Sequence, residues 1–163
     1  MAVLIDGKEL AKKVRGNLKI ECENLKAKGI TPKFAVIMVG DDPASKVYVR
    51  NKSKACDEIG VEYEEHILNA DITQKELIDL IHTLNEDKTV NGILLQSPIP
   101  KHLDIDEAFR EISYEKDVDG FNPVNVGKLL LNQDTFISCT PYGIMKMFEE
   151  YNIDLEGKNL LII

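Results

Sequence analysis

Apolar residues follow two spacings along the chain, and these predict the order of its helices and strands. Phe34–Val39 and Gly92–Gln96 are nearly continuous apolar runs, the pattern of strands buried on both faces. Val61–Ile67 follows a glycine and reads as another strand. Between these runs, apolar residues recur with helical spacing. The helices predicted in this way are Gly7–Lys28, Ala44–Ile59, Thr73–Leu84, Ile105–Ile112 and Thr140–Tyr151.

Residues that favour helix ends mark several of these boundaries. Asp6 is a suitable N-cap for the first helix, and Gly29 ends it. Thr73 and Glu76 have the spacing of a capping box. Thr140-Pro141 has the composition of an N-cap followed by the first helical residue. The resulting β-α-β-α-β-α order predicts an α/β fold, a three-layer α-β-α sandwich with a mostly parallel sheet.

The last residues of the chain predict a domain boundary. Gly157–Ile163 reads as a turn followed by an apolar strand, and an unpaired strand at the end of a domain would invite association. We expect residues 1–156 to form one domain and residues 157–163 to begin a second, truncated, Rossmann-like domain. The alternative, that this strand closes the first sheet, stays open.

Composition is that of an ordinary globular protein. The 163 residues are 44% hydrophobic and 29% charged, which suits one domain with a core. The chain has 20 Lys and Arg against 28 Asp and Glu, a formal net charge of −8. We therefore expect no nucleic-acid partner and no anionic membrane surface, although a local basic pocket could still bind an anionic small molecule.

Cysteine usage and the N-terminus add two expectations. Cys22, Cys56 and Cys139 are widely spaced, and the three histidines do not pair with them at zinc-ligand spacing, so no metal site is predicted. The N-terminus lacks a basic segment followed by an apolar one, and no apolar run approaches the roughly 20 residues that span a bilayer. We expect a cytoplasmic protein.

Tyr48 and Lys52 lie four residues apart on the second predicted helix, so their side chains share one face. Lys52 falls at the border of the expected inward stripe, where partial removal from water favours the neutral amine and suits a lysine to proton transfer. On spacing alone, a surface lysine extended beside a core tyrosine stays an open alternative. The expected inward stripe consists of Ala44, Tyr48, Asn51, Ala55 and Ile59.

Other candidate chemistry lies where strands end. Gln96–Pro100 directly follows a strand, the place where open α/β sheets carry their active sites, and its prolines hold the Gln96 amide at that edge. Lys116–Pro123 reads as a shaped loop, with a plain solvated turn as the alternative. Ser45 lies in the first turn of a helix, but Asp41-Asp42 beside it would repel an anion.

A Tyr-x-x-x-Lys pair also suggests short-chain dehydrogenases, which bind their nucleotide through a glycine-rich turn well before the tyrosine. The glycines before Tyr48 are Gly7, Gly16, Gly29 and Gly40, and they do not cluster. This interpretation is therefore rejected.

Six ordered motifs, taken together, are far more specific than any one of them. They are Ile5–Gly7, Val39–Ser45, Tyr48–Lys52, Gly92–Pro100, Lys116–Pro123 with Asn125, Gly127 and Leu129, and Cys139–Gly143. In this order and spacing, which covers essentially the whole chain, they resemble the bifunctional methylenetetrahydrofolate dehydrogenase/methenyltetrahydrofolate cyclohydrolase family. The combined match outweighs the alternatives left open for single motifs.

The resemblance implies that a tetrahydrofolate derivative binds in a cleft between this domain and a nicotinamide-nucleotide domain. It implies oxidation of 5,10-methylenetetrahydrofolate with NADP to 5,10-methenyltetrahydrofolate, followed by hydrolysis to 10-formyltetrahydrofolate. The residues that hold NADP are expected beyond Ile163. The resemblance also implies a homodimer that acts in one-carbon metabolism and supplies purine biosynthesis.

The resemblance also implies a role for each matching residue of the site. In that likeness Lys52 is the catalytic lysine, chiefly of the cyclohydrolase step, Gln96 positions it, and Tyr48 packs against the folate rings. Asp119 is expected to accept two parallel hydrogen bonds from the guanidine-like edge of the pterin. The implied substrate-binding set is Tyr48, Lys52, Leu95, Gln96, Ser97 and Asp119, and the implied catalytic set is Lys52, Gln96 and Tyr48.

Three residues depart from the family pattern, which commonly has Leu at Ser97, His at Asn122 and Pro at Ser138. We expect Ser97 and Asn122 to alter pocket hydrophobicity or cofactor-side contacts without touching the catalytic lysine. The rival interpretation is a non-catalytic folate-binding or regulatory module that lacks the nucleotide domain.

Overall fold

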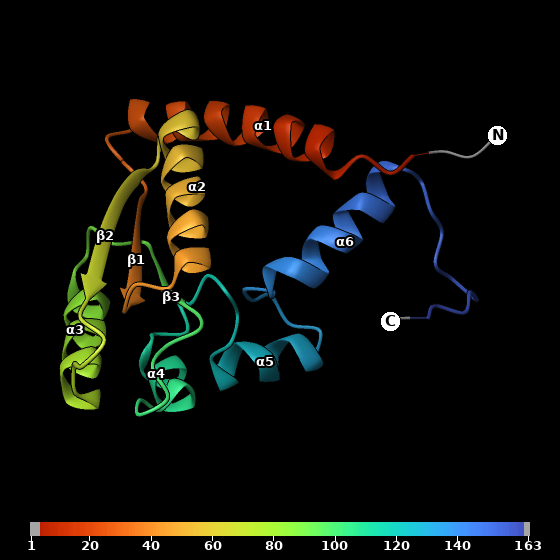
Figure 1. Cartoon of the computed structure of the whole chain (residues 1–163). Coiled ribbons are helices and arrows are strands. Elements are labelled where there is room, and N and C mark those ends of the chain that lie inside the picture. Colours follow the sequence, from red (N-terminus) through yellow and green to blue (C-terminus); the bar gives the residue numbers. More distant parts are fainter. Residues whose placement is uncertain (1–3, 162–163) are drawn as a thin grey trace.

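The computed structural model describes residues 4–161, and the predicted alternation of strands and helices is confirmed in it (Figure 1). The strands are β1 (Lys33–Val39), β2 (Glu62–Leu68) and β3 (Gly92–Gln96). The helices are α1 (Gly7–Ala27), α2 (Pro43–Ile59), α3 (Gln74–Glu86), α4 (Ile105–Glu111), α5 (Pro123–Leu130) and α6 (Cys139–Glu150).

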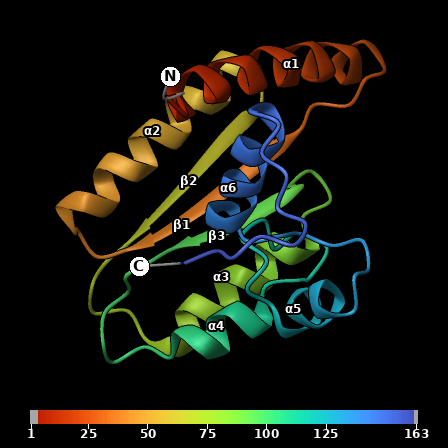
Figure 2. The same ribbon diagram turned by 90° about the vertical axis from the view of Figure 1, so that its right-hand side faces the viewer.

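The strands form one parallel sheet in the order β2-β1-β3. In the central strand, Phe34 lies opposite both Tyr63 of β2 and Gly92 of β3. Figure 2 shows α1 and α2 on one side of the sheet and α3 and α4 on the other. The predicted three-layer α-β-α sandwich is therefore confirmed.

Each face of β1 packs into its own core, because successive strand residues point to opposite sides. Ala35 and Ile37 belong to a buried cluster shared with α3 and α4, and Val36 and Met38 to a second cluster that includes Val49 of α2. With both faces covered, β1 has no solvent side. This explains why its sequence is continuously apolar rather than alternating.

Most helix ends use the predicted chemistry. The Asp6 carboxylate accepts from two backbone N–H groups in the first turn of α1, at 2.9 and 3.1 Å. Thr73 and Glu76 form the capping box of α3. Gly60 ends α2 in the left-handed conformation, with φ at 83°.

Two helix starts differ from the prediction. The predicted N-cap at Thr140 is wrong, because α6 already begins at Cys139, and Ser138 precedes it without a side-chain capping bond. Helix α5 was not predicted, since Lys116–Pro123 was interpreted as a loop and no helix was expected after it. Pro123 instead occupies the first helical position, and the Asn122 side chain caps the helix by accepting from a backbone N–H at 2.8 Å.

The carboxyl-terminal segment turns at Gly157, which has φ of 68°. Residues 158–161 form no strand. Ile162 and Ile163, which the predicted strand includes, lie outside the described residues. The domain boundary at residue 157 stays a prediction.

None of the helices within residues 4–161 is long and apolar enough to cross a lipid bilayer. In the same stretch, His, Cys, Asp and Glu side chains do not gather in groups of three or more that could hold a metal ion.

Candidate functional site

The parallel sheet brings Lys52 and Gln96 together at its carboxyl edge. Gln96 is the last residue of β3 and lies opposite Met38, near the end of β1, from which the chain continues into α2. The Lys52 Nζ atom donates to Gln96 Oε1 at 2.8 Å, and Gln96 Nε2 donates to the Ser97 carbonyl oxygen at 2.7 Å. The glutamine therefore holds the ammonium group through the oxygen of its amide, while the carbonyl of the next residue, Ser97, fixes the amide nitrogen.

Tyr48 lies beside the lysine but not in the core. Its side chain is 60% exposed, and its ring centroid lies 5.8 Å from Lys52 Nζ. The predicted inward stripe of α2 is thus wrong: the buried residues of this helix are Ser45, Val49 and Cys56. This leaves Tyr48 free to present its ring to a ligand beside the half-buried Lys52.

Asp119 lies in the loop between α4 and α5, close enough to Lys52 for the two charges to act on each other. Burial has the largest effect on this carboxyl and raises its pKa, and the negative charge of Asp117 acts in the same direction. The positive charge of Lys52 and, to a smaller extent, the polar Cys139 side chain act the other way. Asp119 is therefore a partly desolvated acid with a lysine as its neighbouring counter-charge, a setting typical of functional carboxyls.

The loop that carries Asp119 is tied down on both sides. The Lys116 ammonium donates to the carbonyl oxygens of Leu84, Asn85 and Asp87 at 2.7–2.9 Å, which anchors the start of the loop to the end of α3. An isolated parallel bridge between Ile93 and the buried Asp117 extends the sheet beyond β3. The loop is therefore shaped by its contacts, as the sequence predicted.

Gly120 allows another segment to approach this loop closely. Its φ is +67°, and a Cβ atom there would lie 2.8 Å from the Phe136 carbonyl oxygen and 3.1 Å from the Ser138 amide nitrogen. Only glycine fits both the conformation and the space. The residues before α6 are thereby brought against the Asp119 loop.

Asn122 has a structural role that differs from the expected one. Its side-chain nitrogen points at the carboxyl end of α4, donating to the Ile112 and Arg110 carbonyl oxygens at 2.9 and 3.2 Å. The side chain is buried, with 6% of its surface exposed. The Asn122 side chain thus joins the carboxyl end of α4 to the start of α5. It holds these two helices together and does not line a pocket.

Two further predicted site residues lie in different settings. The Leu95 side chain is buried in the cluster with α3 and α4, so the structure does not bring it to the lysine. Ser97 is exposed and precedes a cis peptide bond to Pro98. Its carbonyl oxygen, which accepts from Gln96, reaches the site.

Sequence reasoning did not assign Cys139 to the site, yet this residue lies against the Asp119 loop. Its Sγ atom donates to the Val118 carbonyl oxygen at 3.8 Å, immediately before Asp119 in the loop. The pairing joins two residues that are 21 positions apart, which no local spacing reveals. The Cys-Thr-Pro motif was the only available signal.

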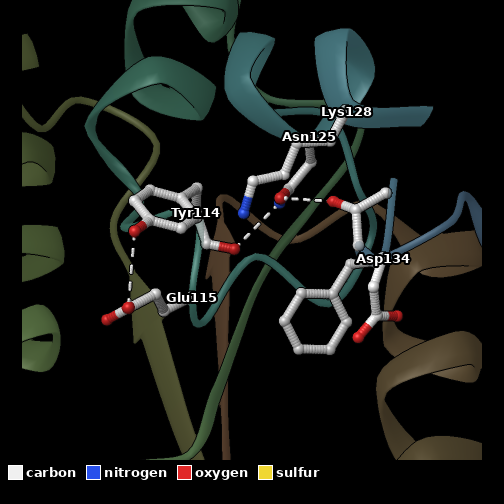
Figure 3. A pocket seen from close by; sticks show the side chains of 7 residues that line it. Tyr114, Glu115, Asn125, Lys128 and Asp134 are labelled. Atoms are coloured by element: carbon white, nitrogen blue, oxygen red, sulfur yellow. Dashed lines mark hydrogen bonds between the residues drawn. The ribbon is translucent and has the colours of Figure 1, made fainter. Parts of the chain in front are cut away.

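A separate cavity of about 510 Å³ lies behind the loop rather than at the lysine (Figure 3). Tyr114 and Asn125 line it, together with Lys128 and Asp134. The buried Asn125 amide is fully paired, because it donates to the Tyr114 carbonyl oxygen and the Asp117 carboxylate and accepts from the Thr135 hydroxyl. The cavity wall is thus also the support of the Asp119 loop.

The possible anion site at the start of α2 is already filled. Asp42 accepts from the Ser45 backbone N–H at 2.7 Å, and this bond is the main reason why the pKa of Asp42 lies below its ordinary value. A carboxylate of the chain itself takes the place that a phosphate would occupy.

An open parallel α/β sheet with a lysine–amide pair and a partly desolvated carboxyl at its carboxyl edge is an arrangement typical of the substrate sites of α/β enzymes. The chain belongs to the tetrahydrofolate dehydrogenase/cyclohydrolase family, whose catalytic-domain model matches residues 5–119.

Curated relatives agree with this membership. The chain is 50% identical over 161 residues to the bifunctional protein FolD of Methanosarcina barkeri and 51% identical over 162 residues to that of Acetivibrio thermocellus. The alignments cover 98% and 99% of the chain but only 56% and 57% of the relatives. The chain thus spans a little over half the length of the curated relatives it matches.

Solved structures show the same fold. The bifunctional FolD enzyme of Campylobacter jejuni matches with a TM-score of 0.94 and 50% identity, covering 96% of this chain and 56% of that one. The Trypanosoma brucei methylenetetrahydrofolate dehydrogenase-cyclohydrolase, solved with NADP cofactor and inhibitor, matches with a TM-score of 0.91 and 34% identity. That alignment covers 96% of this chain and 54% of the other.

Proposed function

We propose that this chain provides the folate site and catalytic lysine of an NADP-dependent methylenetetrahydrofolate dehydrogenase/methenyltetrahydrofolate cyclohydrolase. The observation that carries the proposal is the 2.8 Å hydrogen bond between Lys52 and Gln96 at the carboxyl edge of the sheet, with Asp119 facing the lysine. Family membership and the names of the relatives support this assignment over a non-catalytic module.

Lys52 suits the cyclohydrolase step. Water adds to the carbon of the methenyl cation, and ring opening then gives 10-formyltetrahydrofolate. The addition removes a proton from water, and the ring opening delivers one to a ring nitrogen. A single amine held in place by Gln96 can do both, and general acid–base groups contribute about 10² to 10⁴ in rate.

Asp119 and Tyr48 suit substrate recognition. The pterin ring presents parallel N–H donors at its guanidine-like edge, and a carboxylate accepts two such bonds with matched geometry. Such donors favour the ionised form of Asp119 and so oppose the effect of its burial. The exposed Tyr48 ring offers a flat apolar surface to the folate rings.

The hydride that leaves the one-carbon bridge needs an acceptor, which a bound NADP would supply. The first βα turn of this chain does not fit its pyrophosphate, because Asp42 already caps α2 and only Gly40 could allow close backbone approach. We therefore assign the cofactor to residues outside this chain, in the second domain proposed to begin at residue 157. The whole protein is further proposed to be a cytoplasmic homodimer that supplies one-carbon units for purine biosynthesis, as the family resemblance implies.

Calorimetry tests the folate site directly. The chain should bind the air-stable analogue 5-formyltetrahydrofolate, and Asp119→Ala should weaken binding by about 2–3 kcal/mol, or about 30- to 140-fold. Asp134→Ala removes an exposed carboxylate elsewhere and serves as the matched control, with expected parental affinity. Equal affinity in parent and Asp119→Ala would show that the aspartate only shapes its loop.

A further inference from the structure

The Asp117 carboxylate is a buried group to which the proposed reaction assigns no role. It is 2% exposed and lies two residues before Asp119. One of its oxygens, Oδ2, accepts from the Asn122 backbone N–H at 2.8 Å and from Asn125 Nδ2 at 2.8 Å. Burial removes the water around a carboxylate, and hydrogen bonds of this kind take the place of that water. The carboxylate precedes Asp119 in the sequence and both of its donors follow it.

We propose that Asp117 is a positioning residue. By accepting from the Asn122 N–H, its carboxylate closes the loop of residues 117–122 and fixes the backbone from which Asp119 reaches the pterin. The closed loop is a feature of the unliganded chain. Its use in folate recognition rests on the proposed function.

A second bond within the 117–122 loop also starts at Asp117. The Gly120 N–H donates to the Asp117 carbonyl oxygen at 3.2 Å. Asp119 therefore lies inside a backbone turn that the bond from the carboxylate to the Asn122 N–H encloses. With its backbone held in this way, the Asp119 side chain keeps only its own rotations, so little freedom remains to be lost when a ligand binds.

The start of the loop is attached to the sheet. The Lys116 carbonyl oxygen accepts from the Ile93 N–H of β3 at 2.7 Å. Val118 packs against the buried cluster that β1 shares with α2, and a Cβ atom at Gly92 would lie 2.5 Å from its Cγ1 atom. The bond from the Asp117 carboxylate thus ties the end of the loop, at Asn122, to a fixed start.

Asn125 extends this support to the segment before α6. Its side-chain nitrogen donates to Asp117, and its Oδ1 atom accepts from the Thr135 hydroxyl at 2.8 Å, a bond drawn in Figure 3. The Phe136 carbonyl oxygen, next along the chain, lies where a Cβ atom at Gly120 would be only 2.8 Å away. The Asp117 carboxylate therefore links the loop to α5 and, through Asn125, to the segment that enters α6.

Amide hydrogen exchange followed by NMR tests the closed loop in the unliganded chain. Asp117→Ala removes the acceptor and should speed exchange of the Asn122 N–H by about tenfold or more. Asp117→Asn keeps an oxygen acceptor and should stay within about threefold of the parent. The Thr89 N–H is the control and should not change, because it donates to the Asp87 carboxylate at the same 2.8 Å, at the opposite edge of the sheet. Equal exchange of the Asn122 N–H in parent and Asp117→Ala would overturn the closed loop.

Calorimetry with 5-formyltetrahydrofolate tests the positioning role. Asp117→Ala should bind about tenfold or more weakly, and Asp117→Asn should bind within about threefold of the parent. Because the proposed effect passes through Asp119, the double variant Asp117→Ala/Asp119→Ala should bind no more than about threefold more weakly than Asp119→Ala alone. Thr73→Ala, which removes the capping box of α3, is the control for a loss of stability alone and should bind like the parent. Parental affinity in Asp117→Ala, or losses that multiply in the double variant, would overturn the positioning role.

The parent chain gives a further test that does not depend on the folding of any variant. Saturation with the analogue should slow exchange of the Asn122 N–H by about threefold or more, since a ligand held by Asp119 favours the closed loop, and should leave the Thr89 N–H unchanged. Unchanged exchange of the Asn122 N–H at saturation would overturn the role in recognition. A parent chain that fails to bind the analogue would contradict the folate assignment and the positioning role with it, while exchange in the unliganded chain would still decide the closed loop.

Discussion

Lys52→Met removes the proposed proton-transfer group while keeping a side chain of similar length. The lysine is half-buried, and the hydrogen bond to Gln96 is its one side-chain bond within residues 4–161. Loss of that bond costs about 1 kcal/mol of stability, so the domain should stay folded. Loss of general acid–base catalysis should lower hydrolysis of methenyltetrahydrofolate by about 10² to 10⁴. The effect on rate should thus far exceed the effect on stability.

The assay follows the decay of the methenyl chromophore in a fusion of this chain with the part of the Campylobacter jejuni relative that lies beyond the aligned region. Lys54→Met is the matched control, because Lys54 is an exposed lysine two residues further along α2. The control should retain the parental rate. A Lys52→Met fusion that hydrolyses the substrate within about threefold of the parent would refute the catalytic assignment, since the lost proton transfer is worth at least about a hundredfold.

Three further outcomes follow from particular contacts. Gly120→Ala should destabilise the chain by about 2–3 kcal/mol in urea unfolding, because φ is +67° and a Cβ would lie 2.8 Å from a carbonyl oxygen. Gly16→Ala is the control, in an open part of α1, and should stabilise the chain by about 0.5–1 kcal/mol. The Lys33 ammonium, chiefly through its hydrogen bond, holds the pKa of Glu64 below its ordinary 4.5. The ion pair therefore stabilises the fold above pH 4.5, and this stabilisation is lost as the pH falls through the folded-state pKa of Glu64. Glu64→Gln should flatten that part of the profile of stability against pH. NADPH should show no saturable micromolar binding to the chain when its fluorescence is followed, because Asp42 fills the first βα turn; saturable binding would place a nucleotide site within these residues.

The order of elements could be predicted because it depends on short-range patterns, whereas the lysine–glutamine pair was implied by the family resemblance. Buried parallel strands have continuous apolar runs, and the ends of neighbouring strands meet at one edge of the sheet. Gln96, at the end of a predicted strand, was therefore expected at that edge. The capping box at Thr73 and Glu76 is equally local, since both bonds form within one turn.

The orientation of α2 could not be read from its sequence. Two apolar stripes run along this helix, one with Tyr48 and one with Val49 and Cys56, and they differ by a rotation of about 100°. Periodicity favours neither stripe. The sheet decides between them, because Val49 fits against Val36 and Met38 while the larger tyrosine stays outside.

Long-range polar contacts were also beyond prediction. Cys139 bonds to the Val118 carbonyl oxygen where Gly120 admits the backbone before α6, and Asn125 links Asp117 to Thr135. Each of these contacts depends on the path of a loop rather than on residue spacing. The resemblance to a family placed both segments in the right order but said nothing of their contact.

If Tyr48, Lys52, Gln96 and Asp119 form a folate site within this chain, the ligand must perturb the groups around Lys52. NMR titration of the labelled chain with 5-formyltetrahydrofolate, following side-chain amide and aromatic signals, tests this. We expect saturable shifts at the Gln96 side-chain amide and the Tyr48 ring, which both lie near Lys52 Nζ. Shifts confined to Tyr114 and the other residues around the cavity of Figure 3, or no shifts at all, would contradict it.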